Sequence, residues 1–250
     1  MSNSCHTADR DVLVRFWILD HHRAEAILWG DTEWIKLIFA VEGTILLETS
    51  STHHVLPSNR AMILAPNQPH TARTAGRAKV RTLFFNPSLL ESVISRPVEV
   101  RPLLGELIAE ACRVGPLQRA RARHAELTTL LIAEIVDAPS IPIGIAMPST
   151  EWAQHWAQEF LAEPESAHPP PVSKRTLERV MLRETNLTLG QWCRQARTLV
   201  GLRALSEGAT VLEAGIAAGF ATSSGFIHSF RRQFGVTPGR IFRRSPSKDS

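Results

Sequence analysis

The sequence predicts an α+β protein of two domains, in which a β-rich N-terminal domain precedes an all-helical C-terminal domain. Residues 11–85 hold short apolar runs that turn signals interrupt about every ten residues, which is typical of a β-sandwich or small barrel. After Phe85 the apolar residues recur at helical spacing. Residues 138–148 hold three prolines, as a linker does. We therefore expect domains at residues 1–137 and 149–250.

The apolar runs of the β-rich part end at pairs of turn-forming residues. Glu42-Gly43, Pro66-Asn67 and Ala75-Gly76 are three of these pairs, and glycine, proline and asparagine each favour turn conformations. The pair His53-His54 is expected in a hairpin turn, where it is exposed to solvent and does not ligate a metal.

Helical periodicity continues from Phe85 toward the C-terminus. Six segments fit a helix on this basis, residues 87–94, 102–113, 117–136, 149–163, 173–185 and 189–205. Trp152, Trp156 and Phe160 recur every four residues, and this stripe indicates core packing rather than a cofactor site. Thr188 and Gln191 have the spacing of a capping box, which predicts where the last of these helices begins.

Residues 210–244 have the pattern of two helices joined by a tight turn. Thr210 and Glu213 form another capping-box pair, and Gly219 suits the left-handed position that ends a helix. A second helix begins near Ser223 and carries phenylalanines every four residues, at positions 226, 230 and 234. Its other faces are polar and basic, which favours a helix-turn-helix. A core helix pair with a solvated outer face is the alternative.

Charge is distributed unevenly along the chain. Residues 1–170 hold 15 Lys or Arg and 19 Asp or Glu, a net charge of −4, whereas residues 171–250 hold 13 and 5, a net charge of +8. A basic C-terminal third after an acidic remainder is typical of a polyanion-binding module attached to a sensor domain. A solvated surface without a partner is the alternative.

Composition excludes several classes of protein. No run approaches the roughly 18 consecutive apolar residues of a membrane helix. The N-terminal sequence lacks a basic region followed by an apolar run, so no secretory signal is expected. Cys5, Cys112 and Cys193 fit neither a zinc spacing nor a disulfide framework, which indicates a reducing cytoplasm.

The C-terminal third resembles the AraC/XylS family of bacterial transcription regulators. The resemblance is carried by Gly219-Phe220, Phe226, Phe230, Phe234-Gly235 and Thr237-Pro238, and it extends over residues 173–242. It implies a cytoplasmic, sequence-specific regulator that binds double-stranded DNA, needs no cofactor and has RNA polymerase as a further partner. The helix at residues 117–136 resembles the family's dimer helix, which implies a homodimer. A helix that only covers the β-domain is the alternative.

The same resemblance assigns DNA contacts to two helices. The positions nearest the bases are Ser223, Ser224, Ile227 and His228. The expected phosphate contacts are Arg231, Arg232, Arg243 and Arg244. The helix at residues 173–185 resembles the recognition helix of a first unit, which places Lys174, Arg175, Glu178 and Arg179 on its outer face.

The β-rich part resembles a cupin jelly roll, the sensor domain of many AraC-type regulators. Cupin enzymes hold a metal with several histidines, but Gly30 and Thr32 stand where a histidine pair would be, and only His70 remains at a ligand position. One imidazole cannot build a metal site, so no metal is expected. His70 is a candidate contact to an unidentified small-molecule effector. A loop histidine bonded to the backbone is the alternative.

The first DNA-binding unit departs from the family pattern. A short positioning helix normally precedes the first recognition helix, but residues 161–172 contain four prolines. Each interior proline costs a helix about 3 kcal/mol, so the positioning helix is expected to be absent, or to be replaced by the helix at residues 149–163. The second unit is complete.

Two other functions remain open from the sequence. The first is a metal-dependent cupin enzyme fused to a helical domain, which the missing ligands disfavour. The second is a regulator with impaired DNA binding that acts through protein contacts, which the altered first unit favours.

Overall fold

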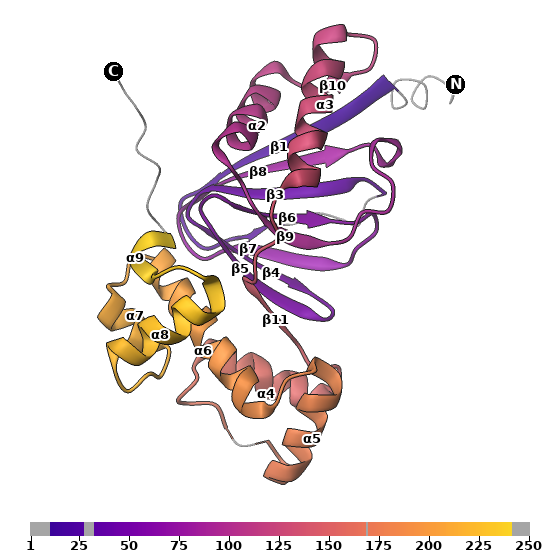
Figure 1. Cartoon of the computed structure of the whole chain (residues 1–250). Helices are drawn as coiled ribbons and strands as arrows, with labels where there is room; N and C mark the ends of the chain where they lie inside the picture. The colour runs from indigo at the N-terminus through magenta and orange to yellow at the C-terminus, as the bar shows by residue number, and fades with distance from the viewer. Residues whose placement is uncertain (1–10, 28–32, 169, 242–250) are drawn as a thin grey trace. The chain divides into compact units, whose positions relative to one another are not determined.

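The computed structural model describes residues 11–27, 33–168 and 170–241. The chain forms two compact units, the first built from residues 1–45 and 58–141 and the second from residues 46–57 and 142–250. Figure 1 shows mostly β-strands up to residue 99 and mostly helices after it. The α+β class predicted from the sequence is confirmed.

A six-stranded antiparallel sheet is the frame of the first unit. Its strands lie in the order β10-β1-β8-β3-β6-β9. Their bounds are β1 Val12–His21, β3 Ile35–Glu42, β6 Arg60–Leu64, β8 Ala78–Phe85, β9 Arg96–Glu99 and β10 Leu117–Gln118. Leu37 of β3 is opposite both Ile63 of β6 and Leu83 of β8. Alternate residues point to opposite faces of a sheet, so this register brings three aliphatic side chains together on one face.

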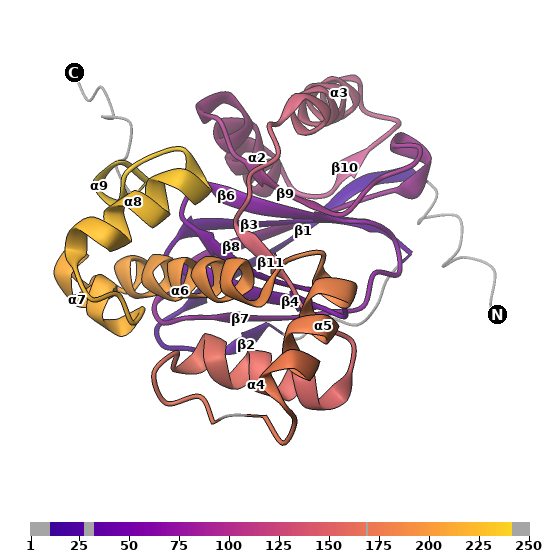
Figure 2. The ribbon, with the colours of Figure 1, turned by 60° about the horizontal axis from the view of Figure 1, so that its bottom comes forward.

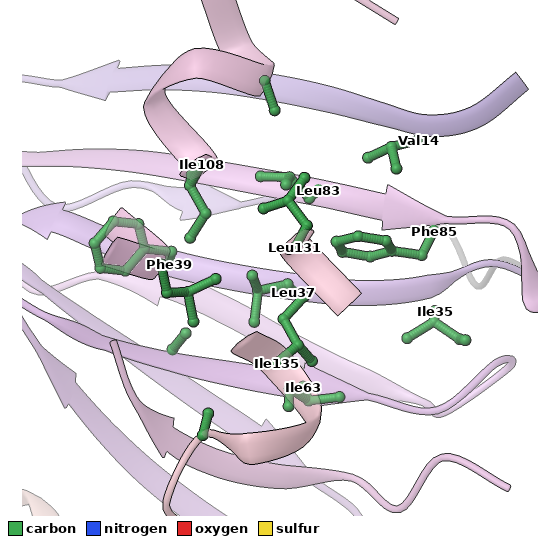
Figure 3. Packing of buried hydrophobic residues seen from close by; sticks show 14 of the residues in the cluster. Val14, Ile35, Leu37, Phe39, Ile63, Leu83, Phe85, Ile108, Leu131 and Ile135 are labelled. Carbon is green, nitrogen blue, oxygen red and sulfur yellow. The ribbon is translucent and has the colours of Figure 1, made fainter. Parts of the chain in front are cut away.

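Two helices cover that face, α2 (Pro102–Val114) and α3 (Ala122–Asp137). Figure 3 shows Ile108 of α2 and Leu131 and Ile135 of α3 beside the sheet residues Leu37 and Leu83. All five are at most 3% exposed. Burying each such side chain contributes about 1.5–3 kcal/mol, so this cluster is the hydrophobic core of the first unit.

A second sheet has the strand order β11-β5-β4-β7-β2. Its strands are β2 Ala26–Ile27, β4 Thr44–Thr49, β5 Thr52–Pro57, β7 His70–Thr74 and β11 Gly144–Ala146. Strand β11 lies within residues 138–148, so the segment predicted as a linker contains a strand that pairs with β5. A strand of three residues is set by its pairing partner, and the local sequence does not reveal it.

The prediction for His53 and His54 is wrong, because both lie in strand β5 rather than in a turn. His54 is 7% exposed, and its Nε2 lies 2.8 Å from the Thr52 hydroxyl. A Cβ on the opposite residue Gly144 would lie 2.3 Å from His54 Nδ1, so only glycine leaves room for the imidazole. Burial, with a smaller contribution from His53, lowers the pKa of His54 to about 4.

Helix bounds after Phe85 differ from the prediction at two places. Residues 87–94 form only a 3-10 turn, Pro87–Leu89, capped by the Asn86 side chain. The helix predicted at residues 117–136 begins at Ala122, because Leu117 and Gln118 pair with β1 as strand β10. No described helix is long and apolar enough to cross a membrane.

Helices of the second unit surround α6 (Leu189–Ser206). They are α4 (Glu151–Ala162), α5 (Lys174–Thr185), α7 (Val211–Ala217) and α8 (Ser223–Phe234), and α9 (Pro238–Ile241) packs on α8. Figure 2 shows α5 at the N-terminal end of α6, with α7 at its C-terminal end. Trp192 of α6 is fully buried, and its ring centroid lies 5.5 Å from that of Trp156 and 5.7 Å from that of Phe160. The predicted core packing is therefore confirmed for Trp156 and Phe160, while Trp152 is half-buried.

Glu184 joins α5 to the start of α4. Its carboxylate accepts hydrogen bonds from the backbone N–H groups of Ser149 and Thr150 and from the Thr150 hydroxyl. Burial raises the pKa of Glu184, but these bonds and the Arg183 guanidinium outweigh that effect and lower it to about 2. A carboxylate at a helix N-terminus also meets the positive end of the helix dipole. This contribution to stability is present above pH 4.5 and is lost toward pH 2.

His54 predicts a separate loss of stability in mild acid. Its pKa is lower in the folded chain than in the unfolded one, so the unfolded state binds more protons between pH 6.5 and 4. We expect the free energy of unfolding to fall by up to about 3 kcal/mol over this range, as measured by urea unfolding at several pH values. His54→Leu should remove this fall. His168→Leu, a change at an exposed imidazole, should not, and equal pH profiles for the two variants would contradict the assignment.

Candidate nucleic-acid interface

Helix α7 and the turn after it are fixed by local hydrogen bonds. The Thr210 hydroxyl accepts from the Glu213 N–H at 3.2 Å, and the Glu213 carboxylate accepts from the Thr210 N–H at 2.8 Å, which confirms the capping box. Gly219 has φ 71°, in the left-handed region. The N–H of Phe220 then donates to the Gly215 carbonyl at 2.9 Å. The chain leaves α7 in a defined direction toward α8.

Helix α8 begins and ends where the sequence predicts. The Thr222 hydroxyl caps its first turn by accepting from the Gly225 N–H at 3.1 Å, and Gly235 ends the helix with φ 74°. The predicted phenylalanine stripe is continuous, with ring centroids 5.6 Å apart for Phe226 and Phe230 and 4.6 Å apart for Phe230 and Phe234. The stripe defines which face of α8 is turned inward.

Packing against α6 holds that inward face in place. Phe226 and Phe230 are fully buried, and the Ser229 hydroxyl lies 3.0 Å from the Thr198 hydroxyl of α6. Gly201 of α6 faces Phe226 so closely that a Cβ there would lie 2.4 Å from the ring. Neither Gly201 nor Thr198 is among the residues that the sequence predicts for this interface. A glycine in the middle of a predicted helix is the signal that indicates such a close approach.

The outer face of α8 is polar and positively charged. Ser224, His228, Arg231 and Arg232 are exposed, while Ser223 and Ile227 are half-buried at its edge. Helix α8 contains no acidic residue, so no carboxylate of its own offsets the two guanidinium groups. Arg243 and Arg244, the other predicted phosphate contacts, lie outside the described residues.

Helix α5 has a similar division of faces. Leu177, Val180 and Met181 are buried. The predicted contact residues Lys174, Arg175, Glu178 and Arg179 are all exposed. The Lys174 ammonium lies 4.0 Å from the Glu178 carboxylate, a weak exposed ion pair. Two arginines on this face therefore carry charge that Glu178 does not offset.

The segment between α4 and α5 contains no helix among its described residues, 163–168 and 170–172. Pro164 is buried, and the Ser166 N–H donates to the Glu163 carbonyl at 3.2 Å in a simple turn. This agrees with the prediction that the positioning helix is absent from this segment or replaced by the preceding helix, α4. Helix α4 packs on α6 through Trp156 and Phe160, while α5 is attached to α4 through Glu184.

His70, the candidate effector contact, lies at the start of β7 and is half-buried. Its Nδ1 donates to the backbone carbonyl of Gln68 at 2.8 Å, which is the backbone-bonded arrangement that the sequence left as the alternative. Gly30 and Thr32, which replace the cupin histidine pair, lie outside the described residues. Within the part of the chain that is described, no three His, Cys, Asp or Glu side chains are grouped as metal ligands.

Comparison with known proteins gives both sequence and structural matches. Residues 171–244 match the model of a helix-turn-helix domain. The HTH-type transcriptional regulator NimR of Escherichia coli K12 is 25% identical over 227 residues, which cover 84% of this chain and 80% of NimR. ToxT of Vibrio cholerae is 11% identical, with a TM-score of 0.38 over 92% of this chain and 97% of that chain. The AraC-like transcriptional activator CuxR is 10% identical, with a TM-score of 0.38 over 87% of this chain and 70% of that chain.

The close approach of Gly201 and Phe226 predicts a matched pair of outcomes. Gly201→Ala should lower the free energy of unfolding by about 1–3 kcal/mol, because the added methyl group must displace a buried ring. Gly190→Ala on the same helix meets nothing within 4 Å, and it should be neutral or stabilising by up to about 1 kcal/mol. Urea unfolding of both variants checks this. Equal stabilities would show that α8 does not depend on this packing.

Proposed function

We propose that the chain is a helix-turn-helix transcriptional regulator of the AraC type, which its matches to a helix-turn-helix domain and to an HTH-type regulator support, and that it reads DNA with the outer face of α8. The single observation that carries the proposal is the exposure of Ser224, His228, Arg231 and Arg232 on one helix whose opposite face is anchored to α6. An α-helix fits the major groove of B-DNA, where every base pair shows a distinct pattern of donors and acceptors.

The side chains divide into two chemical roles. Ser223, Ser224 and His228 offer hydroxyl and imidazole groups to base edges, and Ile227 offers an apolar contact to a thymine methyl group. Arg231 and Arg232 suit phosphate oxygens, which position a protein without reading sequence. Short hydroxyls make weaker discrimination than a bidentate arginine or asparagine. We therefore assign α8 modest base specificity and a strong dependence on salt.

Helix α5 supports a second, weaker DNA contact. Its exposed Arg175 and Arg179 suit phosphates, and tandem units joined by one helix would reach successive major-groove faces about 34 Å apart. Helix α5 is held by its buried Leu177, Val180 and Met181, but the segment before it is a proline-containing loop rather than a short helix. Glu184 fixes only the C-terminal end of α5, to α4, so we assign its outer face to backbone contacts rather than to base reading.

Control by a small molecule, dimerisation and contact with RNA polymerase are further parts of the proposal. The β-rich unit would hold the effector, with His70 as a candidate contact. Leu130 and Val136 of α3 are 53% and 56% exposed, which supports α3 as the dimer helix.

A metal-dependent enzyme is the second function class, and bound iron, manganese or zinc in stoichiometric amount would favour it. A regulator that acts only through protein contacts would give no shift with its own upstream DNA.

Removing the α8 cations gives the main test. Arg231→Ala/Arg232→Ala should weaken binding to a footprinted operator by about tenfold or more and lower the slope of log K against log salt by about two. Fluorescence anisotropy titrations at several salt concentrations measure both quantities. Arg113→Ala/Arg123→Ala, which removes two exposed charges of the first unit, is the matched control. Unchanged affinity and slope in the α8 variant would show that the assigned face is wrong.

The α5 variant should behave differently. Arg175→Ala/Arg179→Ala should lower the salt slope but change the ratio of specific to nonspecific affinity by less than about twofold, because phosphate contacts carry no sequence information. Ser224→Ala/His228→Ala in α8 should lower that ratio while leaving the slope nearly unchanged. Competition titrations against mutated operators measure the ratio. A large loss of specificity in the α5 variant would show that α5 also reads bases.

A further inference from the structure

A cavity of about 280 Å³ lies in the second unit beside α8. Its polar lining comes from two helices, with Gln191, Arg194 and Gln195 on α6 and Ser229, Arg232 and Gln233 on α8. Ligand sites range from about 300 Å³ upward, so the space suits a compact molecule of a few carbon atoms. It lies in a different unit from His70.

The charged groups that line the cavity are all positive. Two guanidinium groups line the cavity and no carboxylate does. Among the described residues, no Asp or Glu lies within ion-pair distance of Arg194 or Arg232. The carboxamides of Gln195 and Gln233 add groups that donate and accept hydrogen bonds, and Gln191, whose oxygen accepts from Thr188 in the capping box, adds a donor. Guanidinium groups bind carboxylates and phosphates with paired, charge-assisted hydrogen bonds, so the lining is complementary to a small oxyanion.

The α6 wall of the cavity is fixed by hydrogen bonds. Gln191, Arg194, Gln195 and Thr198 form one stripe, because residues three and four apart share a helix face. The Thr198 hydroxyl donates to the Arg194 carbonyl at 2.8 Å and lies 3.0 Å from the Ser229 hydroxyl. Since the Thr198 proton is used, Ser229 is the donor in that contact. The two helices that line the cavity are thus bonded to each other through Ser229, which is one of the lining residues.

Arg232 connects the cavity with the outer face of α8. At 100° per residue, it lies 40° from His228 on the outer face and 60° from Ser229 on the cavity side. One guanidinium group can therefore turn to either side, but it cannot neutralise a DNA phosphate and a ligand at the same time.

We propose that this cavity binds a small organic anion bearing carboxylate or phosphate groups, and that the anion competes with DNA for Arg232. The site is separate from an effector site in the β-rich unit. The competition rests on the proposed DNA-binding function, whereas the binding of the anion does not.

Calorimetry with citrate and with inorganic phosphate, at constant ionic strength, tests the site alone. At least one of the two should bind saturably to the full chain, and Arg194→Gln should weaken it by about tenfold or more. Arg203→Gln is the matched control, because it removes the same charge from α6 about 14 Å further along the helix. Arg194 is exposed, so its variant should fold. Absence of saturable binding, or equal binding by Arg194→Gln and the wild type, would overturn the proposal.

DNA titrations test the competition. The binding anion should weaken operator binding by the wild type more than sodium chloride of equal ionic strength, and Arg194→Gln should lose this excess. If the anion weakens operator binding by the wild type no more than sodium chloride does, the competition is overturned. It is also overturned if Arg194→Gln loses as much DNA affinity as Arg232→Ala, because the cavity would then belong to the DNA interface. If the chain binds no DNA even without the anion, the proposed function fails, while the calorimetry still decides on the site.

Discussion

The contact between Phe226 of α8 and Gly201 of α6 is the constraint on which the proposed interface depends. A helix can present a polar face only if its opposite face is held, and here a fully buried ring fits where α6 has no side chain. The Thr198–Ser229 hydrogen bond then sets the rotation of α8 about its own axis. Together these contacts leave Ser224, His228 and Arg231 directed away from the helical core.

The two basic helices of the second unit are supported in different ways. Helix α8 is held by aromatic packing, by two capped ends and by the turn through Gly219. Helix α5 buries Leu177, Val180 and Met181, and it relies on an ionised Glu184 at its C-terminal end. Apolar packing changes little with pH, whereas the carboxylate acts only while it is charged. The two helices therefore differ in how they respond to acid.

Local signals in the sequence predicted most of the helical part, and non-local pairing explains most of what was missed. The capping pairs Thr188–Gln191 and Thr210–Glu213 each lie within four residues, and both form the expected bonds. Strand β11 and the burial of His54 depend on residues about 90 positions apart, which no local pattern contains. For the candidate interface, periodicity predicted which side chains of α8 are exposed. It could not predict the role of Gly201, because that role is set by a ring 25 residues further along the chain.

The proline-containing segment between α4 and α5 bears on how such a chain finds its target. A genome offers on the order of a million or more competing positions, and one helix with the modest base specificity that we propose for α8 would distinguish only a small part of them. A chain whose other basic helix contacts only the DNA backbone, as we propose for α5, must gain selectivity from elsewhere. Two copies bound side by side on one promoter would contact twice the length of DNA. The spacing and orientation of neighbouring half-sites would then be part of what the protein recognises.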